Sequence, residues 1–386
     1  MNEVRTPNAT SPHVIPETWA MTGGEGENSY TKNSSAQQKM TSKIWPLYFD
    51  AIKILNLPSS KEVLRIVDFG CGSALNCIVN VEVIIEYVLK RYAEERKERP
   101  DIQVYFQDVP TNDFNTLFKH IFSTPNDKIL GDEPKNYMVA AIPGSFLNRN
   151  YLLPKSTVNV AVSTHALHWL SKFPDVVRDR MSPAYNGGHT SLFNSSLATV
   201  QACAKEAEEE LDHFLAARAS EVVQGGLVFL TFLVRQGGFY PYKADPVYHI
   251  QEDVWNELVL EGVTTEELRD DFNFPIYCRS LDEVHKVLER YSYVFEVQKE
   301  ESMVSNYFVD PLENPEGSAQ YITAVYKGVS LDFHESYFGK TVTSLFFQRL
   351  EQGLYDIFSR WKLGSPVPEH LQPMWTNAYT VFLRRK

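Results

Sequence analysis

The sequence predicts an α/β protein whose mostly parallel sheet is covered by helices on both faces, a Rossmann-like fold. Residues 63–69 form an apolar, β-branched run that is typical of a strand buried on both faces. Gly70 and Gly72 follow at once, and residues 76–91 then carry apolar side chains at helical spacing. Strand, glycine turn and helix in this order are typical of a nucleotide-type site, with the ligand beyond the carboxyl end of the strand.

Further runs of β-branched and aromatic residues alternate with helical patterns along the chain. The expected strands are 63–69, 102–107, 139–142, 158–163, 226–234, 295–301 and 378–383, which make a seven-stranded sheet. The expected helices are 34–50, 76–91, 197–223, 254–260, 280–291 and 346–360. Asn33 or Ser34 is expected to cap the first helix, and the pair Gly225–Gly226 is expected to end the helix 197–223.

The chain is expected to form one domain behind a short tail. Residues 1–20 are rich in Asn, Thr, Ser and Pro, so a disordered tail is predicted there. The domain, 21–386, is divided into a flap and helix at 21–60, an α/β core at 61–236 with the C-terminal strands, and a largely helical cap over the active site at 178–196 and 237–345. A glycine-rich loop at 21–30 supplies the flap.

Composition narrows the class of protein. The 386 residues are 43% hydrophobic and carry a net charge of −12, which argues against nucleic acid or an anionic membrane as the main partner. The N-terminus has no apolar signal region, and no run of about 18 apolar residues could span a membrane. Four cysteines are too few for a disulfide framework, so a cytoplasmic location is expected.

The glycine turn favours one nucleotide-type ligand over another. A dinucleotide fingerprint requires a third glycine, where Leu75 stands, and an acidic residue about 20 positions on. The acidic residue that closes the second strand is Asp108, at about twice that separation. Asp68-x-Gly70-x-Gly72 instead resembles the first motif of methyltransferases that use S-adenosyl-L-methionine (SAM), with Asp108 placed to accept from the ribose hydroxyls. A glycine turn without a ligand remains the alternative at this point.

Six separated blocks then agree on one family. They read MTGGEGENSYTKNSSAQ (21–37), DFGCGSALN (68–76), DVPTNDFN (108–115), PGSF (143–146), STHALHWLS (163–171) and FNFPIY (272–277). Together they resemble the SABATH methyltransferases of plants, and the resemblance runs from Met21 to the C-terminus. Members of that family methylate carboxylates such as salicylate, benzoate, jasmonate and indole acetate, or ring nitrogens in caffeine synthesis.

The resemblance implies a role for individual residues. The residues implied to bind SAM are Tyr30, Asn33, Ser34, Asp68, Gly70, Asn76, Asp108, Val109, Ser145 and Phe146. The residues implied to bind the acid are Gln37, His165, His168, Trp169 and Tyr248, of which Gln37, His168 and Trp169 are the expected catalytic positions because they orient its carboxylate. Gln37 and the Trp169 indole are uncharged donors, so they leave the carboxylate anionic and attracted to the sulfonium. Such an acceptor needs no base, and catalysis comes from positioning and desolvation.

The resemblance also implies a homodimer and a structural Mg²⁺ ion. The implied metal site consists of Asn186, Asp270, Phe272 and Asn273, whose carboxylate, amide and carbonyl oxygens suit a hard cation. Three positions depart from the family pattern. Thr22 stands where salicylate-methylating members carry a lysine, His165 replaces a frequent tyrosine, and Gly72 replaces serine or alanine. The divergent region 306–320 is expected to line the substrate pocket.

Other functions remain open on the sequence alone. An N-methyltransferase of a small heterocycle is the alternative within the family, and His168 favours the carboxylate. A catalytically silent binding protein would have lost Asp108, Gln37 or the glycine turn, and all are present. A NAD-dependent dehydrogenase is the other enzymatic alternative. His165 and His168 have a spacing compatible with a metal, but no further ligand is evident beside them.

Overall fold

A computed structural model gives the fold of the chain. The residues that it describes are 20–73, 75–123, 137–147, 151–235, 238, 240, 247–305, 309–366 and 376–386. The expected tail, apart from Ala20, lies outside them, and so does part of the region 306–320. Within the described ranges, no helix has both the length and the hydrophobicity that a membrane span requires.

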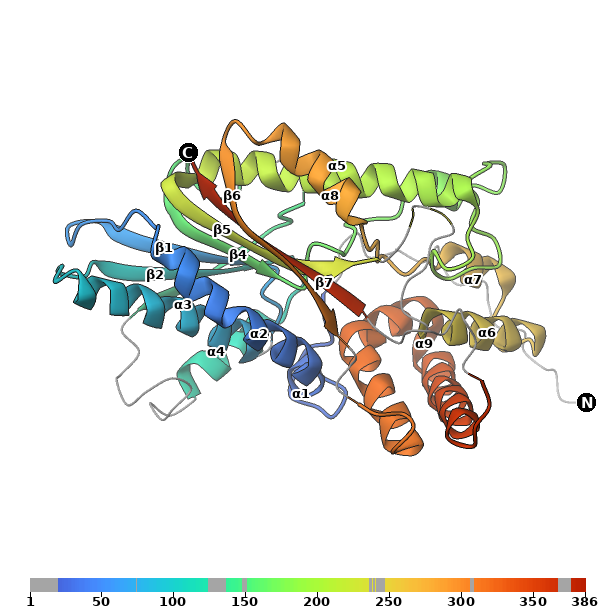
Figure 1. The fold of residues 1–386 in the computed structure, drawn as a ribbon. Coiled ribbons are helices and arrows are strands. Elements are labelled where there is room, and N and C mark those ends of the chain that lie inside the picture. The colour runs from blue at the N-terminus through green and yellow to red at the C-terminus, as the bar shows by residue number, and fades with distance from the viewer. Residues whose placement is uncertain are drawn as a thin grey trace, which may run out of the picture.

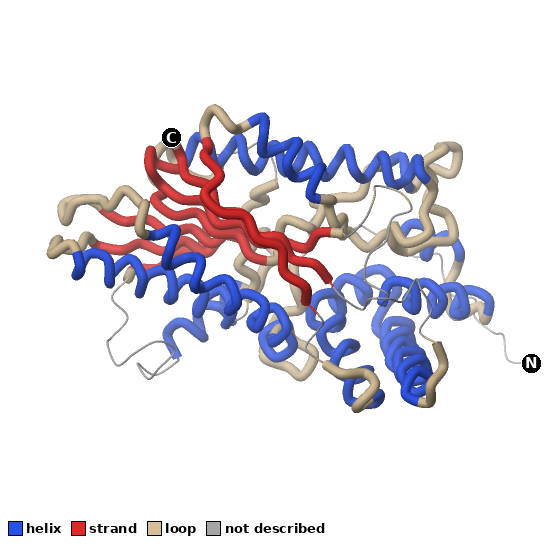
Figure 2. The backbone as a smooth tube through the Cα atoms, viewed as in Figure 1, coloured by secondary structure: helices blue, strands red, loops and turns tan. Residues whose placement is uncertain are grey.

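A seven-stranded sheet forms the centre of the molecule (Figures 1 and 2). Its strands lie in the order β3-β2-β1-β4-β5-β7-β6. Their bounds are β1 Val63–Phe69, β2 Asp101–Asp108, β3 Met138–Pro143, β4 Val158–Thr164, β5 Val222–Val234, β6 Phe295–Ser305 and β7 Thr376–Arg385. The strands β1 to β5 pair in parallel, and β7 runs antiparallel to both of its neighbours. The prediction of a mostly parallel seven-stranded sheet is confirmed.

Helices cover both faces of the sheet and one end of it. Figure 1 shows α2, α3 and α4 on one face, α5 and α8 on the other, and α6, α7 and α9 beyond one end of the strands. Their bounds are α1 Tyr30–Asn33, α2 Ser35–Ile52, α3 Leu75–Glu94, α4 Phe114–Ser123, α5 Leu197–Glu221, α6 Val247–Leu260, α7 Glu266–Asp271, α8 Leu281–Arg290 and α9 Pro315–Lys362. Non-helical backbone at Gly339 divides α9 into two arms.

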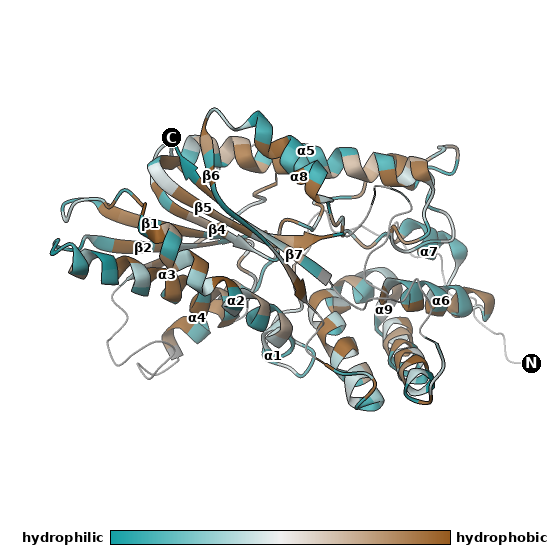
Figure 3. Cartoon of the chain, in the orientation of Figure 1, coloured by the Kyte–Doolittle hydropathy of each residue, from teal (hydrophilic) through white to brown (hydrophobic). Residues whose placement is uncertain are grey.

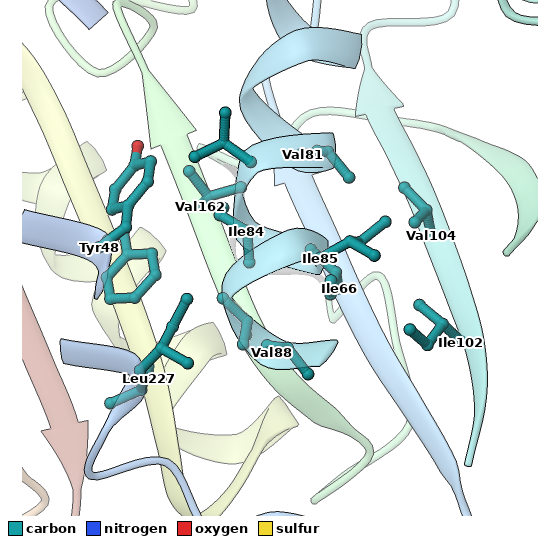
Figure 4. Packing of buried hydrophobic residues seen from close by; sticks show 14 of the residues in the cluster. Tyr48, Ile66, Val81, Ile84, Ile85, Val88, Ile102, Val104, Val162 and Leu227 are labelled. Atoms are coloured by element: carbon teal, nitrogen blue, oxygen red, sulfur yellow. The ribbon is translucent and has the colours of Figure 1, made fainter. Parts of the chain in front are cut away.

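The alternation of β1 explains why the sheet is buried on both sides. Leu64 and Ile66 point into the cluster under α2 and α3, which Figure 4 shows from close by. Val67 and Phe69 point into the opposite cluster, under α5 and α8. Successive side chains of a strand lie on opposite faces, so an apolar run of this length requires helices on both. Figure 3 shows this pattern as hydrophobic residues along the strands and alternating residues around the helices.

Two local expectations are corrected. The helix α5 ends before the glycine pair: β5 already begins at Val222, and Gly225–Gly226 lies inside the strand, where the pairing of β5 with β4 shifts register. Ser34 occupies the cap position of α2, but its side chain makes no capping hydrogen bond. The strand β6 completes the sheet, as the expected seven strands require, and α8 packs against α5.

Candidate active site

The carboxyl ends of the four parallel strands β1 to β4 meet at one edge of the sheet. The backbone immediately beyond them carries Gly70, Asp108, Ser145 and His165. All four residues line one cavity, together with residues from α1, α2 and the start of α3. We call it the cofactor cavity; its lining residues are Ala20, Met21, Tyr30, Gln37, Thr41, Gly70, Cys71, Gly72, Asn76, Cys77, Asp108, Val109, Ser145, Phe146, Leu147, Thr164, His165, Ala166, Trp169, Leu170 and Ser171. This is where a doubly wound sheet holds a nucleotide-type ligand.

Gly70 is required by the way the turn after β1 packs against the loop after β4. Its φ is +77°, in the left-handed region that favours glycine. A Cβ at this position would lie 2.4 Å from the Cβ of Ala166 and 3.2 Å from the Phe146 ring. Its backbone N–H donates to the Gln107 carbonyl over 2.8 Å, which ties the turn to β2. The glycine motif therefore brings the walls from β1, β3 and β4 together.

Asp108 presents a fixed carboxylate to the cofactor cavity. The Gly72 N–H donates to Oδ2 over 2.6 Å, and the Val109 N–H donates to Oδ1 over 2.7 Å. The side chain is half-buried at the cavity wall, and burial raises its pKa to about 6 although these two hydrogen bonds oppose the rise. Each oxygen keeps a lone pair for a further donor, as a pair of ribose hydroxyls would supply.

Asp68 lies buried near this cavity without lining it. It is 1% exposed, and neither carboxylate oxygen has a hydrogen-bond partner among the described residues. Burial, and then the neighbouring charge of Asp108, raise the pKa of the Asp68 carboxyl well above its usual range. An orphaned buried carboxylate is costly unless a cationic group joins it. The ammonium group of SAM would be such a partner, so these residues fit the expected ligand.

Other residues assigned to SAM lie behind the cavity wall. The Asn33 side chain donates to the carbonyls of Glu27 and Ser29, over 2.7 and 2.9 Å, and so holds the flap. The Ser34 carbonyl accepts from Nδ2 of Asn76 over 2.9 Å. Neither Asn33 nor Ser34 lines the cofactor cavity, whereas Asn76 does. The structure therefore places these two residues as supports of α1 and α3.

A second cavity adjoins the first and has a different character. We call it the apolar cavity; its lining residues are Met21, Tyr30, Ala36, Gln37, Met40, His165, His168, Trp169, Leu233, Val247, Tyr248, Ile276, Ile322, Val325, Tyr326 and Val329. Aliphatic and aromatic side chains from α2, α6 and α9 make most of its wall. Among these described lining residues there is no lysine, arginine, aspartate or glutamate. Such a cavity suits the hydrocarbon body of a small molecule.

The two cavities share five wall residues: Met21, Tyr30, Gln37, His165 and Trp169. These residues come from the flap, from α1 and α2, and from the loop after β4. At this junction Oε1 of Gln37 is buried without a hydrogen-bond partner in the described structure. An amide oxygen is an acceptor, so a hydrogen-bond donor of a ligand would satisfy it, and the amide nitrogen beside it is left to donate. The junction is thus the place where a group in one cavity reaches a group in the other.

Both histidines of this loop are neutral at physiological pH. The Leu233 N–H donates to Nδ1 of His168 over 3.3 Å, so the neutral ring carries its proton on Nε2. Burial, then His165, then Arg279 hold the pKa of His168 well below its usual range. Burial lowers the pKa of His165 to about 4, and its Nε2 lies 3.1 Å from Oγ1 of Thr41. No group of three His, Cys, Asp or Glu side chains in the described residues could complete a metal site.

The expected Mg²⁺ site does not fit its residues. Oδ1 of Asp270 accepts from Gly188 and from the Arg269 guanidinium, and Oδ2 accepts from the Tyr185 hydroxyl over 2.5 Å. The other expected ligands are engaged as well. Asn186 donates to Oδ1 of Asn273 over 2.8 Å and accepts from Ser195 over 2.6 Å, while Phe272 packs its ring in the cap core. Donors already occupy the side-chain oxygens of Asp270, Asn186 and Asn273 that a cation would need, so the Mg²⁺ expectation is not supported.

Sequence reasoning named four of the five residues at the junction but missed much of the wall of the apolar cavity. The expected residue Tyr248 lines it, as predicted for a pocket wall. The described part of 306–320 does not line it; the next two turns of α9 do, through Ile322, Val325 and Tyr326. These residues stand at positions i, i+3 and i+4, which lie on one face of a helix. This spacing was the signal in the sequence that could have identified them. In the cofactor cavity, Met21 and Thr41 were missed because their residue types carry no recognisable chemistry.

Comparison with known proteins identifies the family. A sequence profile of the SAM-dependent carboxyl methyltransferases matches residues 16–365. Gibberellic acid methyltransferase 2 of Arabidopsis thaliana is 33% identical over 290 residues, with 73% of each chain covered. Indole-3-acetate O-methyltransferase 1 of Arabidopsis thaliana is 35% identical over 286 residues, which cover 70% of this chain and 72% of that protein.

A solved structure agrees in fold over nearly the whole chain. Loganic acid methyltransferase with SAH (S-adenosyl-L-homocysteine) superposes with a TM-score of 0.80 at 26% identity, covering 95% of this chain and 98% of that one. The sheet order, the cofactor cavity and the profile match therefore agree. The chain belongs to the SABATH family of SAM-dependent carboxyl methyltransferases, enzymes that convert small-molecule carboxylic acids to methyl esters.

Proposed function

We propose that this enzyme methylates an acid with an apolar body and a single carboxylate, held at the junction of the two cavities. The observation that carries the proposal is the shared wall: Gln37 and Trp169 line both cavities, at the boundary between the cofactor cavity and the apolar cavity. A carboxylate at this boundary leaves its hydrocarbon body in the apolar cavity. The absence of a charged side chain from the described wall of that cavity disfavours acids with a second charged group.

The cofactor cavity would hold SAM through several residues. Asp108 would accept from the ribose hydroxyls, Ser145 and Phe146 would flank the adenine, and the buried Asp68 would act on the ammonium through its charge from behind the cavity wall. Tyr30 lines both cavities and closes the site from the flap side. When bound, SAM supplies an electrophilic methyl group to the carboxylate oxygen.

The chain's own residues bind and orient the acid. Gln37 and the Trp169 indole donate to the carboxylate, and neutral His168, with its proton on Nε2, can offer a third donor. Uncharged donors hold the anion without neutralising it, so the acceptor stays nucleophilic. The low pKa values of His165 and His168 keep both rings uncharged beside a bound cation. Catalysis then consists of alignment and the exclusion of water.

The relatives suggest which acids to test first. Gibberellic acid and indole-3-acetic acid appear in the names of the relatives above, and both place a carboxylate on a bulky ring system. The test is SAH release from SAM with each acid, with loganic acid as a glycosylated comparison. We expect turnover with a mono-acid of apolar body, and thermal stabilisation of the enzyme by SAH but not by NAD. Turnover confined to dicarboxylic or glycosylated acids would contradict the proposal.

We also propose a cytoplasmic homodimer. The dimer rests on family resemblance, and the location on the four cysteines, all of them buried and unbridged. Sedimentation equilibrium and localisation of a tagged full-length chain test the two statements separately.

A further inference from the structure

The loop Leu167–Ser171 carries His168 and Trp169, and its backbone is held from one side by an extended segment. The Leu170 N–H donates to the Pro275 carbonyl over 2.8 Å, and the Tyr277 N–H donates to the His168 carbonyl over 2.9 Å. These bonds fix the middle of the loop. Its two ends are held by buried charged side chains.

Arg279 holds the first end. It is 1% exposed, and its NH1 group donates to the Leu167 carbonyl. The other side of the same guanidinium donates twice to the Ala207 carbonyl in α5, from Nε over 3.0 Å and from NH2 over 2.5 Å. The planar fork thus links the start of the loop to α5, which a point-like ammonium could not do in the same geometry.

Glu210 holds the other end. It is 3% exposed, and its Oε1 accepts from the Ser171 N–H over 2.7 Å and from the Ser171 hydroxyl over 2.5 Å. Ala207 and Glu210 are three residues apart, so they belong to one turn of α5. Both ends of the loop are therefore fastened to the same helical turn.

We infer that Glu210 and Arg279 are positioning residues for methyl transfer: they clamp the loop Leu167–Ser171 and so hold Trp169 and His168 at the acid carboxylate. The inference rests on the proposed function for the role of the loop. Neither side chain lines the cofactor cavity or the apolar cavity, so each acts through the loop. We call this pair the loop clamp.

Burying the two charged side chains of the loop clamp costs free energy, so their presence calls for an explanation other than stability. Burial raises the pKa of Glu210 to about 7, against the opposing effect of Ser171 and Arg279. Burial likewise lowers the pKa of Arg279, with Glu210 the largest opposing influence. Two buried charges add less to stability than well-packed apolar side chains of similar volume. Glu210 and Arg279 instead contribute hydrogen bonds of defined geometry to the two ends of the loop Leu167–Ser171.

Two substitutions at Glu210 separate acceptor position from charge. Glu210→Asp keeps the charge but withdraws the acceptor by one carbon–carbon bond, so Ser171 loses its partner. Glu210→Gln removes the charge but keeps an oxygen at the same reach. Glu209→Asp, on the exposed side of the same helix, is the matched control. Steady-state kinetics with the best acid found above give KM for that acid, and calorimetry gives Kd for SAH.

We expect Glu210→Asp to raise KM for the acid by about tenfold or more, because a hydrogen bond to a charged group is lost at the loop. Glu210→Gln is expected to stay within about threefold of the wild type, and Kd for SAH within about twofold in both variants. Arg279→Lys should resemble Glu210→Asp. The amides of residues 165–171 should exchange hydrogen about tenfold faster in Glu210→Asp than in the wild type. In Glu209→Asp their exchange rate should equal that of the wild type.

The outcomes distinguish the inference from a general loss of structure. An unchanged KM and unchanged exchange in Glu210→Asp would overturn it, as would equal weakening of acid and SAH. Weaker acid binding in Glu210→Gln than in Glu210→Asp would show that charge, not reach, matters, and would also overturn it. If the wild type methylates no acid, the proposed function fails, while the exchange of 165–171 still reports whether the loop clamp exists.

Discussion

The affinity for SAH should depend on pH through Asp108. The carboxylate form of Asp108 can accept a hydrogen bond from each of two ribose hydroxyls, whereas the protonated form has fewer acceptor sites. Since the pKa of Asp108 is raised to about 6, the side chain is an anion above that pH and a neutral acid below it. Affinity should therefore be constant above pH 7 and fall as the pH drops through 6.

The size of the effect follows from the titration. One unit below the pKa, about ten molecules in eleven carry the proton, so affinity falls about tenfold between pH 7 and pH 5, or about 1.4 kcal/mol. Asp108→Asn removes the charge at every pH. Losing charge-assisted hydrogen bonds costs about 1.5–3 kcal/mol, so affinity at pH 8 should fall by one to two decades.

Calorimetry with SAH between pH 5 and pH 8 measures both effects. Asp101→Asn is the control, because Asp101 is exposed at the opposite end of the same strand. Asp68 also has a raised pKa, and part of that rise comes from the charge of Asp108, so Asp108→Asn should lower the pKa of Asp68 while Asp101→Asn leaves it unchanged. Parallel pH profiles for the wild type and Asp108→Asn would refute the assignment of Asp108 to the ribose.

Three further predictions concern the clamp on the acid, the cap and the flap. Trp169→Phe should lower kcat/KM for the acid by one to two decades with Kd for SAH unchanged, and Gln37→Leu should have the same effect. Because both residues bind one carboxylate, the loss of kcat/KM in the double variant should be smaller than the two single losses combined. Burial lowers the pKa of His334 to about 4, so its own share of the free energy of unfolding should be full above pH 6.5 and lose about 3 kcal/mol by pH 4; the difference between the wild type and His334→Gln in urea titrations measures this share, and a difference that does not vary with pH would contradict it. Gly328→Ala should weaken SAH binding several-fold, because the new Cβ would lie 3.1 Å from that of Asn33 and displace α1; unchanged calorimetry would count against it.

The central strands of the sheet were predictable because they are buried on both faces. Runs such as 63–69 and 158–163 contain little but apolar and β-branched residues, and the observed strands β1 and β4 match them within one residue. The first arm of α9 was missed, since its apolar residues contact the cap on one side and the flap on another, which blurs the helical period. The prediction that Gly225–Gly226 ends a helix was wrong because glycine is also the residue type found where the pairing of a strand shifts register.

The site was predictable where chemistry needs a particular residue type. Asp108 and Gln37 stand out by type and motif, and the structure places both at cavity walls. The apolar wall is different: Ile322 and Tyr326 could serve equally well in any core, so only the fold shows that they face a cavity. The burial of Glu210 could not be predicted from the sequence, because the adjacent Glu209 is exposed and the burial of Glu210 depends on the loop after β4.

The central claim is that the methyl group goes to a carboxylate oxygen held between Gln37 and Trp169. The most direct measurement uses SAM with a deuterated methyl group, indole-3-acetic acid as the probe, and mass spectrometry of the product before and after mild alkaline hydrolysis. This account predicts a labelled product whose label is released as methanol by alkali, and at least tenfold slower formation of that product by Gln37→Leu combined with Trp169→Phe. Label that survives hydrolysis would place the methyl group on the ring nitrogen and would contradict the account.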